Sequence, residues 1–177
     1  MIKSIYLIGY MGSGKTTLGR KLANRLGYSF IDLDKFIEEK YFRSIPQIFE
    51  EEGECGFREK EHKALEEIAS FSNVVVATGG GAPCFYNNIE IMNQNGATLF
   101  IDVDAGMLAS RLKHSKGERP LVKDKSPDEL LEFICQALEQ RRPYYEQALY
   151  CARGGNLTVD DLLKILETPQ REQESTK

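Results

Sequence analysis

Apolar residues gather in five short runs along the chain, and longer segments with helical spacing separate these runs. The runs are residues 5–9 (IYLIG), 30–34 (FIDLD), 73–81 (NVVVATGGG), 97–104 (ATLFIDVD) and, more weakly, 148–152 (ALYCA). Their length suits buried strands, and strands that alternate with helices are typical of βαβ units around a parallel sheet. The pattern therefore predicts an α/β fold in three layers, α/β/α, with a five-stranded parallel sheet.

A helix and a glycine-rich loop are predicted directly after the first strand. Leu18, Leu22 and Leu26 recur at helical spacing, and the pattern stops at Gly27, a residue favoured at helix C-termini. Between strand and helix, residues 9–16 read GYMGSGKT and satisfy the phosphate-binding motif G-x-x-x-x-G-K-[ST]. The order strand, loop, helix is the context that this P-loop motif requires.

The P-loop predicts how a nucleotide is held. Glycines let the backbone come close to a ligand, and the loop amides with the helix N-terminus can surround phosphates. We expect Lys15 to neutralise the β- and γ-phosphate oxygens and the Thr16 hydroxyl to bind Mg²⁺. The alternative is a glycine turn with a solvated lysine. The expected ATP-binding residues of the loop are Gly12, Ser13, Gly14, Lys15, Thr16 and Thr17.

Two aspartates follow the second predicted strand. Asp32 and Asp34 are two residues apart, so on a strand they would point to the same side at its carboxyl end, where open α/β sheets bind ligands. One carboxylate can hold Mg²⁺ through a water molecule, and the other can approach an acceptor hydroxyl as a base. The alternative for Asp34 is that it caps the following helix.

A second glycine cluster ends the third predicted strand. Gly79, Gly80 and Gly81 leave backbone amides exposed at the edge of the sheet that also carries the P-loop. The two glycine clusters therefore predict one cleft.

Two arginines on predicted helices are further candidates for this cleft. Arg58 belongs to a predicted helix over residues 53–68, where the alternative is an exposed side chain paired with Glu54 or Glu61. Arg141 belongs to a second predicted helix, and its alternative is a side chain that covers apolar surface while its charge stays in water.

This second helix, over residues 130–149, has a predicted apolar face. Pro143 should kink or break it, because proline lacks a backbone N–H. The neighbouring Arg142 can be a solvated side chain. The expected apolar stripe consists of Leu131, Ile134, Leu138 and Tyr145.

The composition suits one domain that binds small molecules. The chain has 177 residues, of which 41% are hydrophobic, and this is enough for a single core. Its net charge of −4 disfavours a broad surface for nucleic acid. No stretch approaches the roughly 18 apolar residues of a membrane span. We expect small-molecule partners, no nucleic acid, no membrane and a monomer.

The cysteines indicate a reducing compartment. They form no C-x-x-C pair, and with only two histidines no zinc-type spacing occurs. The opening MIKSIYLIG is too short an apolar stretch for a signal peptide. We therefore expect a cytoplasmic protein with four reduced thiols, at Cys55, Cys84, Cys135 and Cys151.

Two segments differ from the rest of the chain. Residues 114–129 (HSKGERPLVKDKSPDE) are charged and broken by Gly117 and Pro120, as in a lid or a disordered insertion. We expect a mobile lid over about 113–125. The polar residues 169–177 are expected to form a flexible tail.

A P-loop alone does not separate a GTPase, a motor ATPase and a small-molecule kinase, although the absence of an NKxD element disfavours a GTPase. The combined pattern resembles the shikimate kinase family, P-loop enzymes of aromatic amino-acid biosynthesis that phosphorylate the 3-hydroxyl of shikimate with ATP. The resemblance covers nearly the whole chain and implies one P-loop kinase domain over residues 1–168. It rests on GYMGSGKT (9–16), DLD (32–34), FRE (57–59), GGG (79–81), RPL (119–121) and RRPYY (141–145).

The resemblance also implies roles for individual residues. Asp32 would support Mg²⁺, and Arg119 would be the arginine of the lid and an ATP contact. Arg111 and Arg153 would lie near adenine. The implied catalytic set is Lys15, Asp34 and Arg119. The implied shikimate contacts are Asp34, Arg58, Gly80 and Arg141, with Gly79 and Gly81 in the same glycine cluster.

The chemistry of shikimate agrees with these roles. Its carboxylate suits a clamp formed by Arg58 and Arg141, and Asp34 can receive its hydroxyls. Phosphoryl transfer depends mainly on positioning and charge neutralisation, which Lys15, Mg²⁺ and Arg119 can supply.

Two other functions fit parts of the pattern. A different small-metabolite kinase, such as a gluconate kinase, shares the P-loop and the lid but needs no pair of arginines facing the acceptor. A nucleotide-binding regulatory module could keep the fold without the chemistry, although the charged residues of the predicted site are all present.

Overall fold

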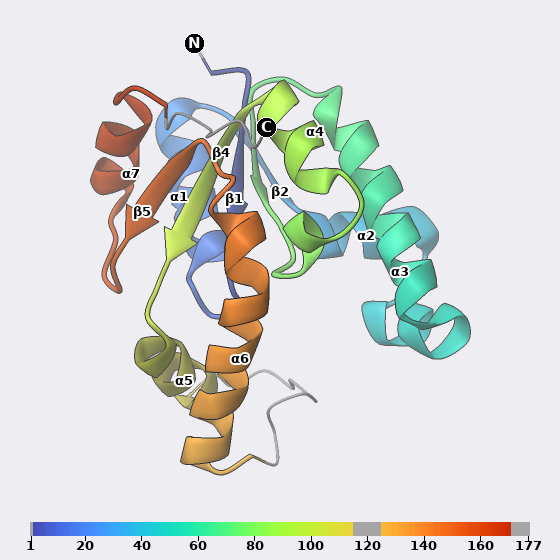
Figure 1. Cartoon of the computed structure of the whole chain (residues 1–177). Helices are drawn as coiled ribbons and strands as arrows, with labels where there is room; N and C mark the ends of the chain where they lie inside the picture. Colours follow the sequence, from blue (N-terminus) through green and yellow to red (C-terminus); the bar gives the residue numbers. More distant parts are fainter. Residues whose placement is uncertain (1, 115–124, 171–177) are drawn as a thin grey trace, which may run out of the picture.

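The computed structural model describes residues 2–114 and 125–170 of the chain. Five strands form one sheet in the order β2-β3-β1-β4-β5 (Figure 1), and each neighbouring pair is parallel. The predicted five-stranded parallel sheet is therefore confirmed. Its strands are β1 (Ser4–Ile8), β2 (Ser29–Asp32), β3 (Val74–Ala77), β4 (Ala97–Asp102) and β5 (Tyr150–Arg153).

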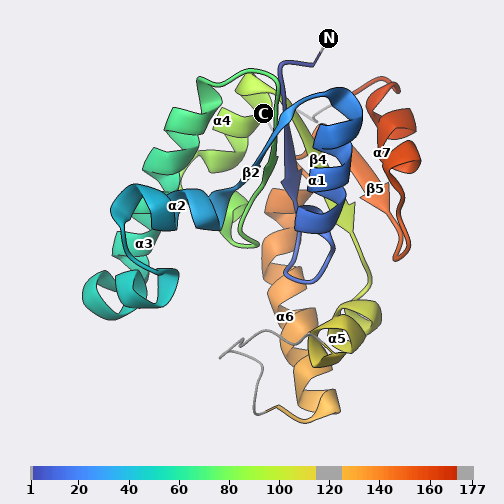
Figure 2. The same ribbon diagram turned by 180° about the vertical axis from the view of Figure 1, so that it is seen from behind.

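Helices cover both faces of the sheet, as the predicted three layers require. Helices α1 (Lys15–Leu26) and α7 (Val159–Leu166) lie on the face turned to the viewer in Figure 2. The short helix η1 (Ala82–Cys84), α4 (Asn88–Asn95) and the end of α6 (Pro127–Tyr145) lie on the opposite face. Strands β1, β3 and β4 are buried along their whole length, because helices shield both of their faces.

The remaining helices extend beyond the sheet. Helices α2 (Leu33–Tyr41) and α3 (Ile45–Ala69) pack together beside β2, and α5 (Ala105–His114) packs on α6 beyond the carboxyl ends of the strands (Figures 1 and 2). In α3, the non-helical Gly53 separates a first short part from the helix predicted over residues 53–68.

The P-loop connects β1 to α1 as the motif predicts. Gly12 and Gly14 have positive φ angles of 80° and 97°, which only glycine adopts without strain. At the other end of α1, Gly27 is a left-handed cap with φ of 69°, and its N–H bonds to Ala23 and Asn24 carbonyls. The predicted end of this helix is confirmed.

The prediction that Asp34 belongs to a strand is wrong. Strand β2 ends at Asp32, and Asp34 lies in the first turn of α2. The predicted alternative, Asp34 as the cap, is also wrong, because the Asp32 side chain accepts the Lys35 N–H at 3.4 Å. A carboxylate that satisfies a free first-turn donor lets the chain become helical at Leu33.

The apolar stripe of α6 differs by one position from the prediction. Leu130 is buried, whereas Leu131 is 39% exposed. Leu130, Ile134 and Leu138 are four residues apart and therefore share one helical face, while Leu131 is turned away. Helix α6 continues through Pro143 and ends two residues later, at Tyr145, so the predicted break falls just after the proline.

Parts of the sequence predictions lie outside the described residues. They are residues 115–124 of the predicted lid, which include Arg119, and residues 171–177 of the predicted tail. Among the helices that the structure describes, none is long and apolar enough to cross a membrane.

Candidate active site

A cleft opens at the carboxyl ends of β1, β2 and β3, where the two glycine clusters meet as predicted. We call it the strand-edge cleft, and its volume is about 360 Å³. The P-loop contributes Gly12, Gly14, Lys15, Thr16 and Thr17 to its lining. The end of β2 contributes Asp32, and the segments after β2 and β3 contribute Asp34, Gly79 and Gly80.

Lys15 occupies the centre of the P-loop. Its side chain is buried, and its Nζ donates to the Gly9 carbonyl at 2.7 Å and to the Tyr10 carbonyl at 2.8 Å. These contacts keep the ammonium group at the wall of the strand-edge cleft. A phosphate in the cleft would meet this charge together with the N-terminus of α1.

Thr16 and Asp32 approach each other across the cleft. The Thr16 hydroxyl donates to Asp32 Oδ2 at 3.3 Å, and Asp34 lines the same cleft. These oxygen ligands fit Mg²⁺, which binds through one or two protein oxygens and completes its shell with phosphate and water. The described residues contain no cluster of three or more side chains that would form an all-protein metal cage.

Asp34 is accessible from the cleft, yet protein surrounds it on the other sides. This desolvation raises the pKa of the Asp34 carboxyl, and the nearby Asp32 charge raises it further, while Lys15 and Arg58 act in the opposite direction. A carboxylate with a raised pKa accepts a proton from an acceptor hydroxyl more readily.

The second glycine cluster leaves room for charged side chains. A Cβ atom at position 79 would lie 3.2 Å from Asp34 Oδ1, and one at position 81 would lie 2.6 Å from Arg58 Nη2. A Cβ atom at position 80 would lie 3.3 Å from Arg141 Nη1. The structure therefore brings both predicted arginines and Asp34 against this cluster.

Arg58 is held by acidic and aromatic neighbours. Its Nη1 donates to Glu61 Oε2 at 2.7 Å, and its Nη2 lies 3.3 Å from Glu54 Oε1. Its guanidinium carbon lies 4.1 Å from the centroid of the Phe85 ring. Both ion pairs of the alternative interpretation exist, but the side chain is only 12% exposed and faces the glycine cluster instead of open solvent.

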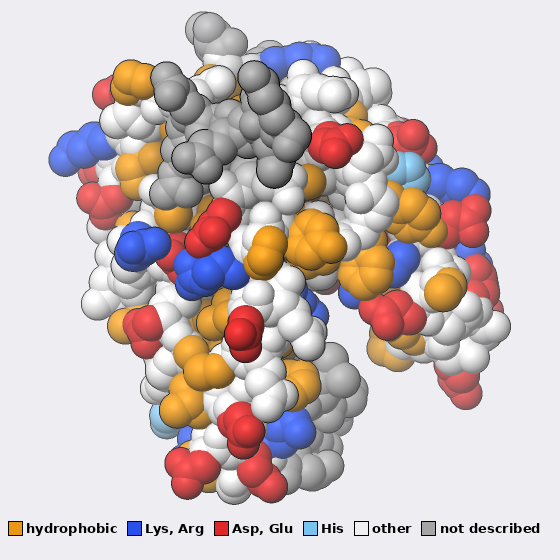
Figure 3. Space-filling model, viewed as in Figure 1, with side chains coloured by type: hydrophobic (Ala, Val, Ile, Leu, Met, Phe, Trp, Pro, Cys, Tyr) orange, Lys and Arg blue, Asp and Glu red, His pale blue; other side chains and the backbone are white. Residues whose placement is uncertain are grey.

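Arg141 and Arg142 point to different neighbours. Arg141 lies beside Gly80 and over the ring of Tyr10, whereas Arg142 Nη2 pairs with Asp102 Oδ1 at 3.3 Å. Only Arg141 therefore belongs to the candidate site, as predicted from the sequence. Figure 3 shows the surface hollowed between the lower ends of α3 and α6.

Glu61 is a site residue that the sequence reasoning treated only as an ion-pair partner. Its side chain is completely buried, and its Oε1 has no hydrogen-bond partner among the described residues. Desolvation raises the pKa of Glu61 to about 6, while the Arg58 charge acts against this rise. Its spacing of three residues from Arg58 indicated contact, but no local signal indicated burial.

A second cleft of about 500 Å³ lies on the other side of the P-loop, and we call it the loop cleft. Arg111 lines it and donates from Nη1 to the Gly12 carbonyl at 3.2 Å and from Nη2 to the Gly155 carbonyl. Arg111 thus links the P-loop to the segment between β5 and α7. The predicted residues Gly12, Ser13, Gly14 and Thr17 also line this cleft.

Two of the predicted ATP contacts, Arg153 and Arg119, are not assigned to either cleft. Arg153 is 75% exposed, pairs with Asp102 Oδ2 at 2.9 Å and lines an adjoining pocket. Arg119 lies outside the described residues. Their proposed contacts with ATP stay predictions.

Comparisons with known proteins identify relatives over nearly the whole chain. The sequence model of the family described as "Shikimate kinase" matches residues 11–168. A shikimate kinase of Bacteroides thetaiotaomicron is 49% identical over 170 residues, which cover 96% of each chain. A shikimate kinase of Phocaeicola vulgatus is 51% identical, over 92% of this chain and 97% of its own.

Solved structures lead to the same relatives. A crystal structure of shikimate kinase from Bacteroides thetaiotaomicron superimposes with a TM-score of 0.90 at 46% identity, covering 95% of this chain and 100% of the other. Shikimate kinase from Acinetobacter baumannii, solved in complex with shikimate, gives a TM-score of 0.81 at 40% identity, covering 94% and 92%. A gluconokinase from Sinorhizobium meliloti, at 22% identity and a TM-score of 0.59, shares the fold alone.

Proposed function

Because the chain belongs to the shikimate kinase family, we propose that its two clefts hold ATP and shikimate side by side around the P-loop. The chain is an ATP-dependent phosphotransferase that forms shikimate 3-phosphate on the pathway to aromatic amino acids. One observation supports placing shikimate apart from ATP: Arg58 and Arg141 both adjoin residues 79–81, next to the P-loop.

ATP occupies the P-loop and the loop cleft in this proposal. Amides at the N-terminus of α1 bind the phosphates, and Lys15 neutralises the oxygens of the transferred group. The nucleoside lies in the loop cleft beside Arg111. Arg153 and Arg119 are further predicted contacts of ATP, and Arg119 is also the predicted partner of the transferring phosphoryl group.

Thr16 and Asp32 are the residues that would hold Mg²⁺, Thr16 through its hydroxyl and Asp32 through a water molecule. Their spacing of 3.3 Å beside the P-loop supports this assignment. The ion would neutralise phosphate charge and orient the phosphates.

Shikimate occupies the strand-edge cleft on the side of the second glycine cluster. Arg58 and Arg141 bind its carboxylate with charge-assisted hydrogen bonds, and the amides of residues 79–81 contact the ring substituents. Asp34 accepts a hydrogen bond from the 3-hydroxyl and takes its proton as the hydroxyl oxygen bonds to the γ-phosphorus of ATP and the bond from this phosphorus to ADP breaks. The raised pKa of Asp34 supports this role.

We further propose a monomer in the cytoplasm. Among the described residues, none of the four cysteines is joined in a disulfide, which supports a reducing compartment. Size-exclusion chromatography with light scattering tests the monomer.

An acceptor assay tests the proposed function. ADP release is measured with shikimate, with gluconate and without an acceptor. We expect ADP release in the sample with shikimate and in neither of the other two samples. Turnover with gluconate would assign another metabolite kinase, turnover without acceptor an ATPase, and no turnover in any sample a nucleotide-binding module.

A further inference from the structure

Tyr10 lies in the P-loop, but its side chain faces the acceptor side of the site. It is the second residue of the loop and is 1% exposed. Its carbonyl accepts from Lys15 Nζ at 2.8 Å, which ties its backbone to the phosphate side. Its ring centroid lies 5.3 Å from the guanidinium carbon of Arg141. A guanidinium within about 6 Å of an aromatic ring is attracted to the ring face.

Arg141 lacks the kind of support that Arg58 has. Two carboxylates, Glu54 and Glu61, pair with Arg58. Within the described residues, Arg141 forms no ion pair with a carboxylate at 4 Å or less. Its orientation therefore depends on other contacts, and the face of Tyr10 is one of them.

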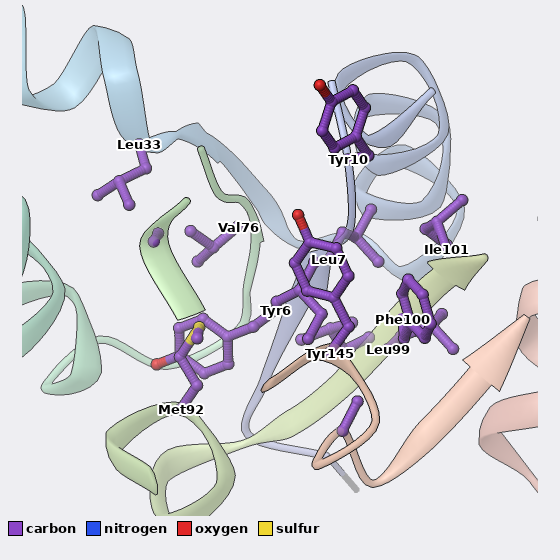
Figure 4. Packing of buried hydrophobic residues seen from close by; sticks show 14 of the residues in the cluster. Tyr6, Leu7, Tyr10, Leu33, Val76, Met92, Leu99, Phe100, Ile101 and Tyr145 are labelled. Atoms are coloured by element: carbon purple, nitrogen blue, oxygen red, sulfur yellow. The ribbon is translucent and has the colours of Figure 1, made fainter. Parts of the chain in front are cut away.

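The other contacts of Arg141 leave it little freedom. Gly80 adjoins its Nη1, and the Tyr145 hydroxyl interacts with its guanidinium. The same hydroxyl donates to the Gly80 carbonyl at 2.6 Å. Gly80 and Tyr145 thus confine Arg141 together with the ring of Tyr10. In Figure 4, the hydroxyl of Tyr145 points toward the side of the core on which the ring of Tyr10 lies.

The hydroxyl of Tyr10 does not explain why a tyrosine stands here. It is buried and has no hydrogen-bond partner among the described residues. A buried hydroxyl without a partner costs free energy, so the useful part of this side chain is its ring. We propose that Tyr10 is a positioning residue whose ring face fixes Arg141 in the orientation that binds the shikimate carboxylate.

This inference rests on the proposed function, since it assumes that Arg141 binds the acceptor. In this inference the P-loop also contributes to the acceptor site. The backbone carbonyl of Tyr10 holds Lys15, and the Tyr10 ring holds Arg141. An error in the orientation of Arg141 should weaken shikimate binding and leave ATP binding almost unchanged.

The chain offers a matched control at Tyr6 on β1. Tyr6 is also fully buried, and its hydroxyl also lacks a partner among the described residues. Figure 4 shows its ring beside Met92, away from Tyr10. The same substitutions at Tyr6 and Tyr10 therefore remove the same atoms from the core, and only those at Tyr10 affect an arginine of the site.

The experiment compares Tyr10→Leu, Tyr10→Phe, Tyr6→Leu and Tyr6→Phe in the full chain. Steady-state kinetics give KM for shikimate, KM for ATP and kcat, and thermal unfolding reports stability. We expect Tyr10→Leu to raise the shikimate KM about five- to tenfold, the range of a cation–π contact, with the ATP KM unchanged. Tyr10→Phe should keep the wild-type value, and Tyr6→Leu should lose stability without a change in either KM.

A variant that preserves the shape of the side chain covers the case in which Tyr10→Leu does not fold. Pentafluorophenylalanine at position 10 keeps the ring but reverses its charge distribution, so it should raise the shikimate KM where phenylalanine does not. A cycle with Arg141→Met should show that Tyr10→Leu has little further effect on shikimate affinity once the guanidinium is absent.

Three results would overturn the inference: an unchanged shikimate KM in Tyr10→Leu, equal losses in the leucine and phenylalanine variants, or additive effects in the cycle with Arg141→Met. The failure of the proposed function is distinct from these results, because the wild-type protein would then show no turnover with shikimate.

Discussion

At the scale of residues, the site combines buried and half-buried charges whose neighbours decide their roles. Lys15 is held by carbonyl groups of its own loop, Arg58 by carboxylates and Arg141 by a ring and a tyrosine hydroxyl. Each arrangement orients a long side chain before a ligand binds, which reduces the entropy lost on binding.

Lys15→Met should abolish most of the turnover while the protein stays folded. Methionine fills a similar volume, but it cannot neutralise the charge of the transferring phosphoryl group. We expect kcat to fall by about 100-fold or more, the effect of losing one preorganised charge contact. Lys63→Met, an exposed position on α3, is the control. A kcat near that of the wild-type protein would contradict the P-loop assignment.

Glu61 should make stability depend on pH. Burial raises its pKa from 4.5 to about 6, so its contribution to stability is fully present below pH 4.5 and is lost as the pH rises through about 6. The unfolding free energy of the wild-type protein, relative to Glu61→Gln, should fall by about 2 kcal/mol between pH 4 and pH 7.

Denaturant titrations at several pH values measure this difference. Glu90→Gln, at an exposed position on α4, is the control and should show no such trend. A difference between wild type and Glu61→Gln that is constant over this range would show that Glu61 keeps an ordinary pKa in the folded protein.

At the scale of elements, the turn after β3 decides how closely the arginines approach the cleft. Gly81 has φ of −88° and ψ of −17°, which any residue can adopt. Glycine is therefore needed here because it leaves room for a neighbouring side chain, and not for its backbone conformation. The space is filled by the guanidinium group of Arg58.

Gly81→Ala should therefore weaken shikimate binding without strain in the backbone. Its Cβ atom would lie 2.6 Å from Arg58 Nη2, and the guanidinium would have to move away from Glu61 and Phe85. We expect the shikimate KM to rise about tenfold or more, because displacements near 1 Å disturb binding geometry strongly.

Gly27→Ala is the control, for which we expect a loss of stability without a change in shikimate binding. Gly27 has a left-handed φ of 69° and open space around it, far from the acceptor. Alanine there should cost about 1 kcal/mol of unfolding free energy and leave both KM values unchanged. If Gly81→Ala lost stability while keeping its shikimate KM, the proposed role of this turn would be refuted.

At the scale of the whole molecule, we expect Mg²⁺ to be required for turnover but not for the stability of the fold. The described part of the chain has a continuous apolar core and no cage of metal ligands. Excess EDTA should therefore abolish ADP release, and added Mg²⁺ should restore it, while the unfolding temperature of the nucleotide-free protein stays the same. A marked loss of stability in EDTA would indicate a structural metal instead.

The sequence by itself determined the features that depend on neighbouring residues. The P-loop, the five strands, the end of α1 at Gly27 and the glycine cluster at 79–81 are local patterns, since backbone freedom and side-chain periodicity act over a few residues. The alternation of strands and helices, which predicted a parallel sheet, followed from the same periodicity. At Asp34 the local signals gave the wrong result: the residue belongs neither to the predicted strand nor to the helix cap, because Asp32 caps α2.

Only the tertiary structure decided which distant side chains meet. Tyr10 and Arg141 are in contact although 131 positions of the numbering separate them, and Glu61 becomes buried where the glycine turn after β3 packs against α3. Such contacts depend on how whole elements pack, and no local pattern records that packing. The physical reason is that burial, desolvation and orientation are properties of the surroundings in space, whereas the sequence lists only neighbours along the chain.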